Sequence, residues 1–192
     1  PILKPQIHSV DGSNTLCVDF DTDILQNELT LQSTLQSNNY MYTWFLDGVE
    51  IIGANQPTYT INTVAPGLYT VAITEITVES SCTPQISNAF EVIKSGQAVL
   101  VNVSQSTSFQ PNPTITVTVE GYGEYWFQLN DGEVLDNNGV FTNVVGGTHT
   151  VMVYDRKTPF SCGVVTIEDI TIIDFPRFFT PVIGIMIVLV LC

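Results

Sequence analysis

The sequence predicts an all-β protein made of tandem antiparallel β-sandwiches. Three observations support this fold class: apolar and polar residues alternate in short runs, turn residues separate the runs, and the pattern of the first half returns in the second. Sustained helical spacing of apolar residues with capping signals is missing from the sequence. Many short strands at this spacing are typical of sandwiches.

The predicted strands are short and rich in Val, Ile, Thr and aromatic residues, which suit a half-buried pleated surface. Turn pairs such as Asp47-Gly48, Pro66-Gly67 and Asp131-Gly132 separate them. In chain order, the predicted strands occupy residues 15–18, 42–46, 70–74, 115–119, 150–154 and 164–167.

An internal repeat divides the chain. The segment Tyr-Thr-Trp-Phe-Leu-Asp-Gly at 42–48 returns at 125–132, and Pro-Gly-Leu-Tyr-Thr-Val at 66–71 returns as Gly-Gly-Thr-His-Thr-Val. A polar break at 94–97 lies between two strand-rich runs. We therefore expect one sandwich at 1–95, a second at 96–176, and an apolar tail at 177–192.

Four residues are predicted to have structural roles in the two cores. Trp44 and Phe127 lie on corresponding aromatic strands, so we expect their rings between the sheets. Tyr69 stands where a tyrosine-corner residue would, with its hydroxyl bonded to backbone. His149 takes the corresponding place in the second repeat, as a packed structural histidine.

Charge and composition exclude several classes of function. Five Lys and Arg against nineteen Asp and Glu give a net charge of −14, which repels phosphate and argues against nucleic-acid binding. Only 12% of residues are charged, below the roughly 25% of typical globular proteins. This composition suits an extracellular β-protein better than a cytosolic enzyme.

The four cysteines are spaced too widely for a zinc site. Because Cys17 and Cys82 both fall in the first repeat, we expect a disulfide between them, which indicates an oxidising compartment. Cys162 has no partner within its repeat and is expected as a buried free thiol. Cys192 is the last residue of the sequence.

Candidate sites are few. Asp19, Asp21 and Asp23 have the alternating spacing of calcium-loop ligands, although the glycine and distal glutamate of such loops are missing, and a solvated acidic loop is the alternative. No other cofactor is indicated. Sequence motifs for a catalytic nucleophile, a metal-dependent hydrolase or a phosphate loop are also missing, so we expect no enzyme activity.

Three aromatic residues form a candidate binding surface. Tyr122, Tyr125 and Trp126 cluster on one predicted hairpin, and an outward-facing Trp beside Tyr could stack on sugar rings. The alternative is that these side chains pack on the neighbouring domain or on the linker.

Segments in both halves of the chain resemble a known group of proteins. Residues 42–48 and 66–71 resemble the immunoglobulin-like and PKD-like repeats of Bacteroidetes surface proteins. The run Asn-Val-Val-Gly-Gly-Thr-His-Thr-Val at 143–151 is followed by Ile-Ile-Asp-Phe-Pro-Arg-Phe-Phe-Thr-Pro at 172–181. These segments are similar to the region that leads into the C-terminal sorting domain of gliding-motility-associated, type IX-secreted adhesins. The resemblance implies a location on the outer face of the bacterial outer membrane.

The sequence departs from this family after Pro181. Residues 182–192 are apolar, so they are read as a truncated or frame-shifted start of the sorting domain. A partial membrane span and a buried or aggregation-prone strand are the alternatives, since about 20 apolar residues are needed to cross a bilayer.

These observations predict a non-catalytic structural or adhesive repeat module of a large secreted or cell-surface protein. Its partners are then the neighbouring repeats of the same chain and an extracellular protein or glycan. A glycan- or protein-binding sandwich is the first alternative. The second is the ectodomain of a single-pass membrane protein, attached to the membrane through residues 182–192.

Overall fold

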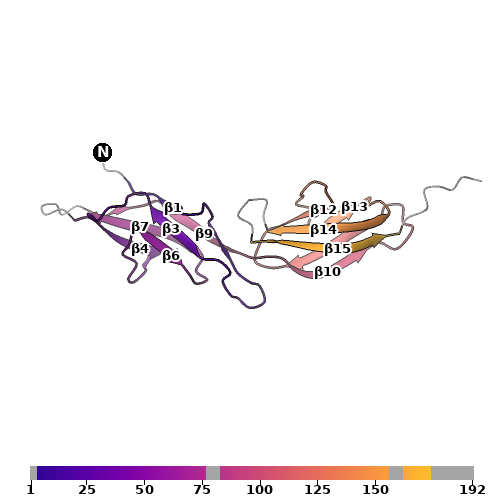
Figure 1. The fold of residues 1–192 in the computed structure, drawn as a ribbon, viewed down its shortest axis with the longest axis horizontal. Coiled ribbons are helices and arrows are strands. Elements are labelled where there is room, and N and C mark those ends of the chain that lie inside the picture. Colours follow the sequence, from indigo (N-terminus) through magenta and orange to yellow (C-terminus); the bar gives the residue numbers. More distant parts are fainter. Residues whose placement is uncertain (1–3, 77–82, 156–161, 174–192) are drawn as a thin grey trace, which may run out of the picture.

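A computed structural model describes residues 4–76, 83–155 and 162–173. These residues form fifteen β-strands, and the molecule is all-β as the sequence predicts. Figure 1 shows the strands in two groups that lie end to end along the long axis. Every described strand pair lies wholly within residues 7–95 or wholly within residues 99–172.

The first sandwich contains two sheets with strand orders β1-β3-β6 and β2-β9-β7-β4-β5, and β8 pairs with β7. Strand β2 runs parallel to the end of β9, with Cys17 opposite Ser95, whereas the other described pairs are antiparallel. The strands are β1 (Ile7–Ser9), β2 (Thr15–Cys17), β3 (Leu29–Ser33), β4 (Tyr40–Leu46), β5 (Val49–Glu50), β6 (Thr58–Ile61), β7 (Gly67–Glu75), β8 (Gln85–Ile86) and β9 (Phe90–Ser95).

The second sandwich has two three-stranded sheets, β10-β11-β13 and β12-β14-β15. Its pairing repeats that of the first: β12-β14-β15 corresponds to β4-β7-β9, and β11-β13 corresponds to β3-β6. The strands are β10 (Val99–Gln105), β11 (Thr114–Glu120), β12 (Tyr125–Leu129), β13 (Val140–Thr142), β14 (Gly147–Asp155) and β15 (Val164–Ile172).

Each sandwich buries its own apolar core, because alternate residues of each strand point between its sheets. Burial alternates along β7 and along β14, where every second residue is inside. The first core includes Leu16, Leu29, Leu31, Tyr42, Trp44, Ile61, Tyr69, Val71, Ile73 and Val92. The second includes Ala98, Ile115, Val117, Phe127, Phe141, Val144, Val151, Val153, Ile170 and Ile172.

The four residues assigned to the cores lie inside. Trp44 has no exposed surface, and its Nε1 donates a hydrogen bond to the Gln56 carbonyl at 2.9 Å. Phe127 is also buried. The Tyr69 hydroxyl donates to the Ala65 carbonyl, four residues back, at 2.7 Å.

His149 makes the matching contact in the second sandwich. Its Nε2 lies 2.8 Å from the Val145 carbonyl oxygen, again four residues back, and its Nδ1 lies 3.0 Å from the Asn130 amide nitrogen. Both ring nitrogens therefore have hydrogen-bond partners. The same corner is built in one sandwich with a tyrosine and in the other with a histidine.

The apolar tail and two cysteines, Cys82 and Cys192, lie outside the described residues. So does the run 174–181 that carries the strongest part of the family resemblance. Within the described residues, no helix is long and apolar enough to cross a membrane.

Candidate functional site at the junction of the two sandwiches

The two sandwiches are joined by a short linker that is itself packed. Strand β9 ends at Ser95 and β10 begins at Val99, so residues 96–98 are the whole connection. Gly96 is buried, and a Cβ atom there would overlap the carbonyl oxygen of Val18. Ala98 belongs to the core of the second sandwich. The backbone therefore crosses the junction in close contact with both sandwiches.

A disulfide crosses the same junction. Cys17, at the end of β2, is bonded to Cys162, between β14 and β15, with an S–S distance of 2.07 Å and a Cα–Cα distance of 5.3 Å. The predicted pairing of Cys17 with Cys82 is therefore wrong, and so is the predicted free thiol at Cys162.

The reason lies in the strand order. Parallel pairing of β2 with the end of β9 places Cys17 opposite Ser95, the last strand residue before the linker. The cysteine thus lies at the end of the first sandwich that faces the second. A pairing rule that looks for partners within one repeat cannot anticipate this position.

A buried carboxylate forms the second tie between the sandwiches. Asp155, the last residue of β14, has no exposed surface, and neither does Ser95. The Ser95 hydroxyl donates to Asp155 Oδ1 at 2.6 Å, and the Cys162 N–H donates to Oδ2 at 2.9 Å. Both oxygens of the carboxyl group thus accept hydrogen bonds, as a buried polar group requires.

An aromatic and ionic cluster forms the third tie. Tyr122 of the second sandwich packs edge-on against Phe20 of the first, with ring centroids 5.0 Å apart and an interplanar angle of 66°. The Tyr122 hydroxyl donates to Asp23 Oδ1 at 2.6 Å. Lys94 Nζ lies 3.3 Å from the centroid of the Tyr122 ring and 3.0 Å from the same carboxylate oxygen.

Asp23 and Lys94 each shift the pKa of the other. The hydrogen bond from Tyr122, together with the hydrogen bond and charge of Lys94, lowers the pKa of Asp23 below its usual value. For Lys94, partial burial opposes the charged form, but the bonds to Asp23 and Tyr122 outweigh it and raise the pKa. The Asp23 side chain is 70% exposed, so this tie is weakened by solvent and salt.

The three residues of the predicted aromatic binding surface lie on two different sides of the sheet. The Tyr125 hydroxyl donates to the Gly96 carbonyl at 3.2 Å and accepts from the Gly123 N–H at 3.1 Å, so it belongs to the junction with Tyr122. Burial is the main cause that raises the pKa of Tyr125. Trp126 follows in β12 and faces the opposite side of the sheet, so the three side chains do not form one platform.

Two of the three calcium candidates have other partners. Asp19 Oδ1 accepts hydrogen bonds from the Thr22 hydroxyl at 2.6 Å and the Thr22 N–H at 2.9 Å, which lower its pKa. Asp23 is taken by Tyr122 and Lys94, and Asp21 is exposed. In the part of the chain that the structure describes, no three His, Cys, Asp or Glu side chains are placed to hold a metal ion.

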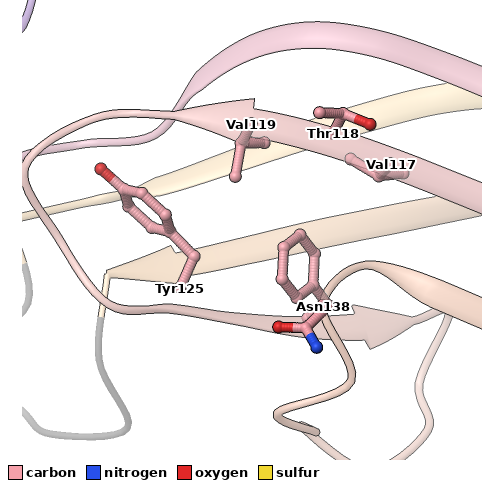
Figure 2. A pocket seen from close by; sticks show the side chains of 6 residues that line it. Val117, Thr118, Val119, Tyr125 and Asn138 are labelled. Carbon is pink, nitrogen blue, oxygen red and sulfur yellow. The ribbon is translucent and has the colours of Figure 1, made fainter.

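Two hollows remain. One, of about 260 Å³, lies between β11 and β12 and is lined by Val117, Val119, Tyr125, Phe127 and Asn138 (Figure 2). This lining mixes apolar side chains with polar groups and contains no acid–base pair. The other, of about 510 Å³, runs along the junction between the exposed Leu68 and Tyr122, with Glu91 and Glu124 on its walls.

Comparisons with known proteins transfer no function to this chain. No protein-family model and no curated protein matches it. Among solved structures, the ligand-binding domain of human OSCAR aligns with 13% identity and a TM-score of 0.39, over 86% of this chain and 98% of that one. A two-domain fibronectin type III segment of chicken tenascin aligns with 12% identity and a TM-score of 0.38, over 86% of this chain and 98% of that one.

The fibronectin III-like modules of CbhA from Clostridium thermocellum align with 14% identity and a TM-score of 0.37, over 88% of this chain and 95% of that one. Alignments at this level carry no argument, so the fold rests on the strand pairing described above.

Proposed function

We propose that this chain is a non-catalytic structural or adhesive repeat unit of a large secreted or cell-surface protein, in which the junction holds two sandwiches as one rod. The observation that carries the proposal is the disulfide between Cys17 and Cys162, because it joins the two sandwiches directly. A spacer holds a binding region at a set position only if its domains keep a fixed relative orientation.

Three different kinds of interaction support the rod. The disulfide is covalent, the Ser95–Asp155 hydrogen bond is buried, and the Phe20–Tyr122 contact is aromatic. They involve different strands and loops of each sandwich. Two domains of one chain usually move relative to each other. Three contacts around a packed linker therefore support a restricted interdomain motion.

The disulfide also supports a location outside the cytosol, since such bonds persist in oxidising compartments. The low charge density and the family resemblance at 42–71 and 143–181 favour the exterior of a bacterial outer membrane. Export by type IX secretion and a role in gliding motility belong to this proposal through that resemblance alone.

The test compares interdomain rigidity with and without the cross-link. Residual dipolar couplings would be measured for the oxidised protein and for the Cys17→Ser/Cys162→Ser variant. Cys82→Ser is the control, because it replaces a cysteine without breaking the Cys17–Cys162 bond. We expect one alignment tensor to fit both sandwiches in the oxidised protein and in Cys82→Ser. Two independent tensors in the oxidised protein would refute the rod.

A second candidate is a protein- or glycan-binding module. The observation in its favour is the hollow along the junction, where the 48% exposed Leu68 faces an aromatic ring between two acidic residues. A glycan array and a pull-down from extracellular fractions would be run with the wild type, Leu68→Ser and Trp126→Ala. Specific binding that either substitution abolishes would favour this candidate over a pure spacer.

A further inference from the structure

The disulfide joins two residues that lie near opposite ends of the described chain. Cys17 and Cys162 are separated by 145 positions, whereas the described residues begin at 4 and end at 173. Two covalent paths therefore connect residue 4 with Ile173. The long path follows the backbone through both sandwiches and the linker, and the short path takes residues 4–17, the S–S bond and residues 162–173.

The short path consists largely of strands that are already extended. It contains β1, β2, which ends at Cys17, and β15, which begins two residues after Cys162. A strand rises about 3.3 Å per residue and a fully stretched chain reaches at most about 3.6 Å per residue, so these strands can lengthen very little. Figure 1 shows β15 running along the second sandwich, from the junction to the end that points away from the first sandwich.

Without the bond, a pull on the two ends would have to cross non-covalent contacts. In the first sandwich it would enter through β2 and leave through the end of β9, two parallel strands that pair with Cys17 opposite Ser95. Pulling such strands in opposite directions shears their hydrogen bonds. In the second sandwich the pull would enter through β10 and leave through β15, which lie in different sheets, so the load would cross the apolar core.

With the bond, each loaded strand is held at both of its own ends. Strand β15 is pulled at Cys162 and at Ile173, and strand β2 is pulled at its start and at Cys17. The tension then stays within the covalent backbone of these strands and puts no net shear on the strands that pair with them. Residues 18–161, which include the linker and most strands of both sandwiches, lie outside the path of the load.

Hydrogen bonds keep the unloaded parts attached to the two cysteines. The Cys17 N–H donates to Asn27 Oδ1 at 2.6 Å, and the Cys17 carbonyl accepts from the Gln26 N–H at 2.7 Å. In the second sandwich, the Cys162 N–H donates to Asp155 Oδ2 at 2.9 Å. Each sandwich is thus fastened at the point where the load passes through the bond.

We propose that the Cys17–Cys162 bond makes this chain a tension-bearing link, in which a pull along the polypeptide passes through residues 4–17, the bond and residues 162–173 and bypasses both cores. The sandwiches then remain folded under loads that would unfold them if the backbone alone carried the pull. This inference rests on the proposed function, because only a unit joined to polypeptide on both sides is pulled in this way.

Single-molecule force spectroscopy tests the bypass. The full chain would be tethered through peptide tags at its two ends, and the oxidised wild type would be compared with Cys17→Ser/Cys162→Ser under the same slowly rising force. Unfolding of the variant should lengthen the tether by about 500 Å, because 145 positions separate the two residues and each adds about 3.5 Å. At the forces that unfold the variant, the oxidised protein should show no step.

Two further proteins act as controls. Cys82→Ser replaces a cysteine but keeps the bond, so it should behave as the wild type does. If the double variant fails to fold, wild type treated with dithiothreitol before tethering supplies the comparison. This dithiol reduces the bond to two thiols and is itself oxidised to a cyclic disulfide, and thiol labelling confirms the reduction. The reduced protein should lengthen as expected for the variant.

Three results would overturn the proposal. Steps on the order of tens of ångströms in the oxidised protein, at the forces that unfold the variant, would mean that β2 or β15 peels away and that the load reaches the sandwiches. A lengthening of about 500 Å in the oxidised protein would mean that the load does not pass through the bond. Equal resistance of the oxidised protein and the variant would mean that the bond shields nothing.

Failure of this inference is distinguishable from failure of the proposed function. The residual dipolar couplings report the relative orientation of the sandwiches without load. Two alignment tensors would refute the rod even if the oxidised tether shows no step. Steps in the oxidised tether together with a single tensor would refute the bypass and leave the rod intact.

Discussion

Ser95 Oγ lies 2.6 Å from Asp155 Oδ1, and both residues are fully buried although sixty positions separate them in the sequence. Each residue is the last of a strand, one in each sandwich. The Asp155 carboxyl group is out of contact with water, so its two oxygens can accept hydrogen bonds only from protein donors. One acceptor oxygen of Asp155 in the second sandwich therefore receives its hydrogen bond from the first sandwich.

Replacing Asp155 with Ala should destabilise the protein and loosen the junction. The change leaves the Ser95 hydroxyl and the Cys162 N–H without their acceptor, at a cost of about 1–3 kcal/mol for a buried unsatisfied group. Urea unfolding would measure the change in the free energy of unfolding. Asp136→Ala, in an exposed loop, is the control and should stay within about 0.5 kcal/mol of wild type. Equal effects of the two substitutions would contradict a role for the buried carboxylate.

The cysteine pairing can be mapped directly. Proteolysis of the unreduced protein should release one peptide pair that contains Cys17 and Cys162. The bond closes a loop with a sequence separation of 145, so its reduction should lower the free energy of unfolding by roughly 3–5 kcal/mol. A Cys17–Cys82 peptide pair would instead support the pairing expected from the repeat.

These residues mark the limit of what the sequence predicts. The strands at 42–46, 70–74, 115–119 and 150–154, the internal repeat and the core aromatic residues follow from alternation and turn chemistry, because these signals are local along the chain. Trp44 and Tyr69, for example, are recognisable from their place in the aromatic segment and in the Gly-Leu-Tyr-Thr-Val segment.

The junction does not follow, because its contacts join loops from different repeats. Lys94 and Ser95 fall in the polar run that marks the domain boundary, but nothing local indicates that they meet Asp23 and Asp155. Tyr122 is visible as an aromatic residue, and only the three-dimensional arrangement gives it Phe20 as a partner. Two cysteines in different repeats were the available signal for a cross-link between domains.

Acid should release the Asp23 cluster. Since the pKa of Asp23 is lowered in the folded protein, its contribution is present above the pKa of the unfolded chain, about 3.9, and is lost as the pH falls through the lower folded value. The ring signals of Tyr122, followed by NMR from pH 7 to pH 2, should shift in this window as the Asp23 bond is lost. In Asp23→Asn the transition should disappear, and high salt should weaken the Lys94 contact already at pH 7.

Lys94 provides the check on this interpretation. A Lys94→Met variant keeps the length of the side chain but removes the charge that faces both Asp23 and Tyr122. The acid transition of Tyr122 should then move toward higher pH, because less positive charge stabilises the carboxylate. An unchanged midpoint would mean that the ion pair does not act on Asp23 in solution.

Alkali should destabilise the first sandwich through Tyr69. Burial, together with the nearby Tyr59 and Asp47, raises the pKa of Tyr69 from its ordinary 10.0 to about 12. The folded protein thus retains a proton that the unfolded chain releases, so stability is complete below pH 10 and falls as the pH rises toward 12. The full difference corresponds to roughly 2–3 kcal/mol.

Tyr69→Phe separates this titration from other alkaline effects. At pH 7 the variant should lose about 1 kcal/mol, because the hydroxyl no longer donates to the Ala65 carbonyl. Between pH 10 and pH 12, however, its free energy of unfolding should fall less steeply than that of the wild type. Tyr40→Phe, at the half-buried start of β4, is the control and should retain the wild-type slope. If Tyr69→Phe kept that slope as well, the alkaline loss of stability would have to arise elsewhere, and the buried hydroxyl at the corner of β7 would have no part in it.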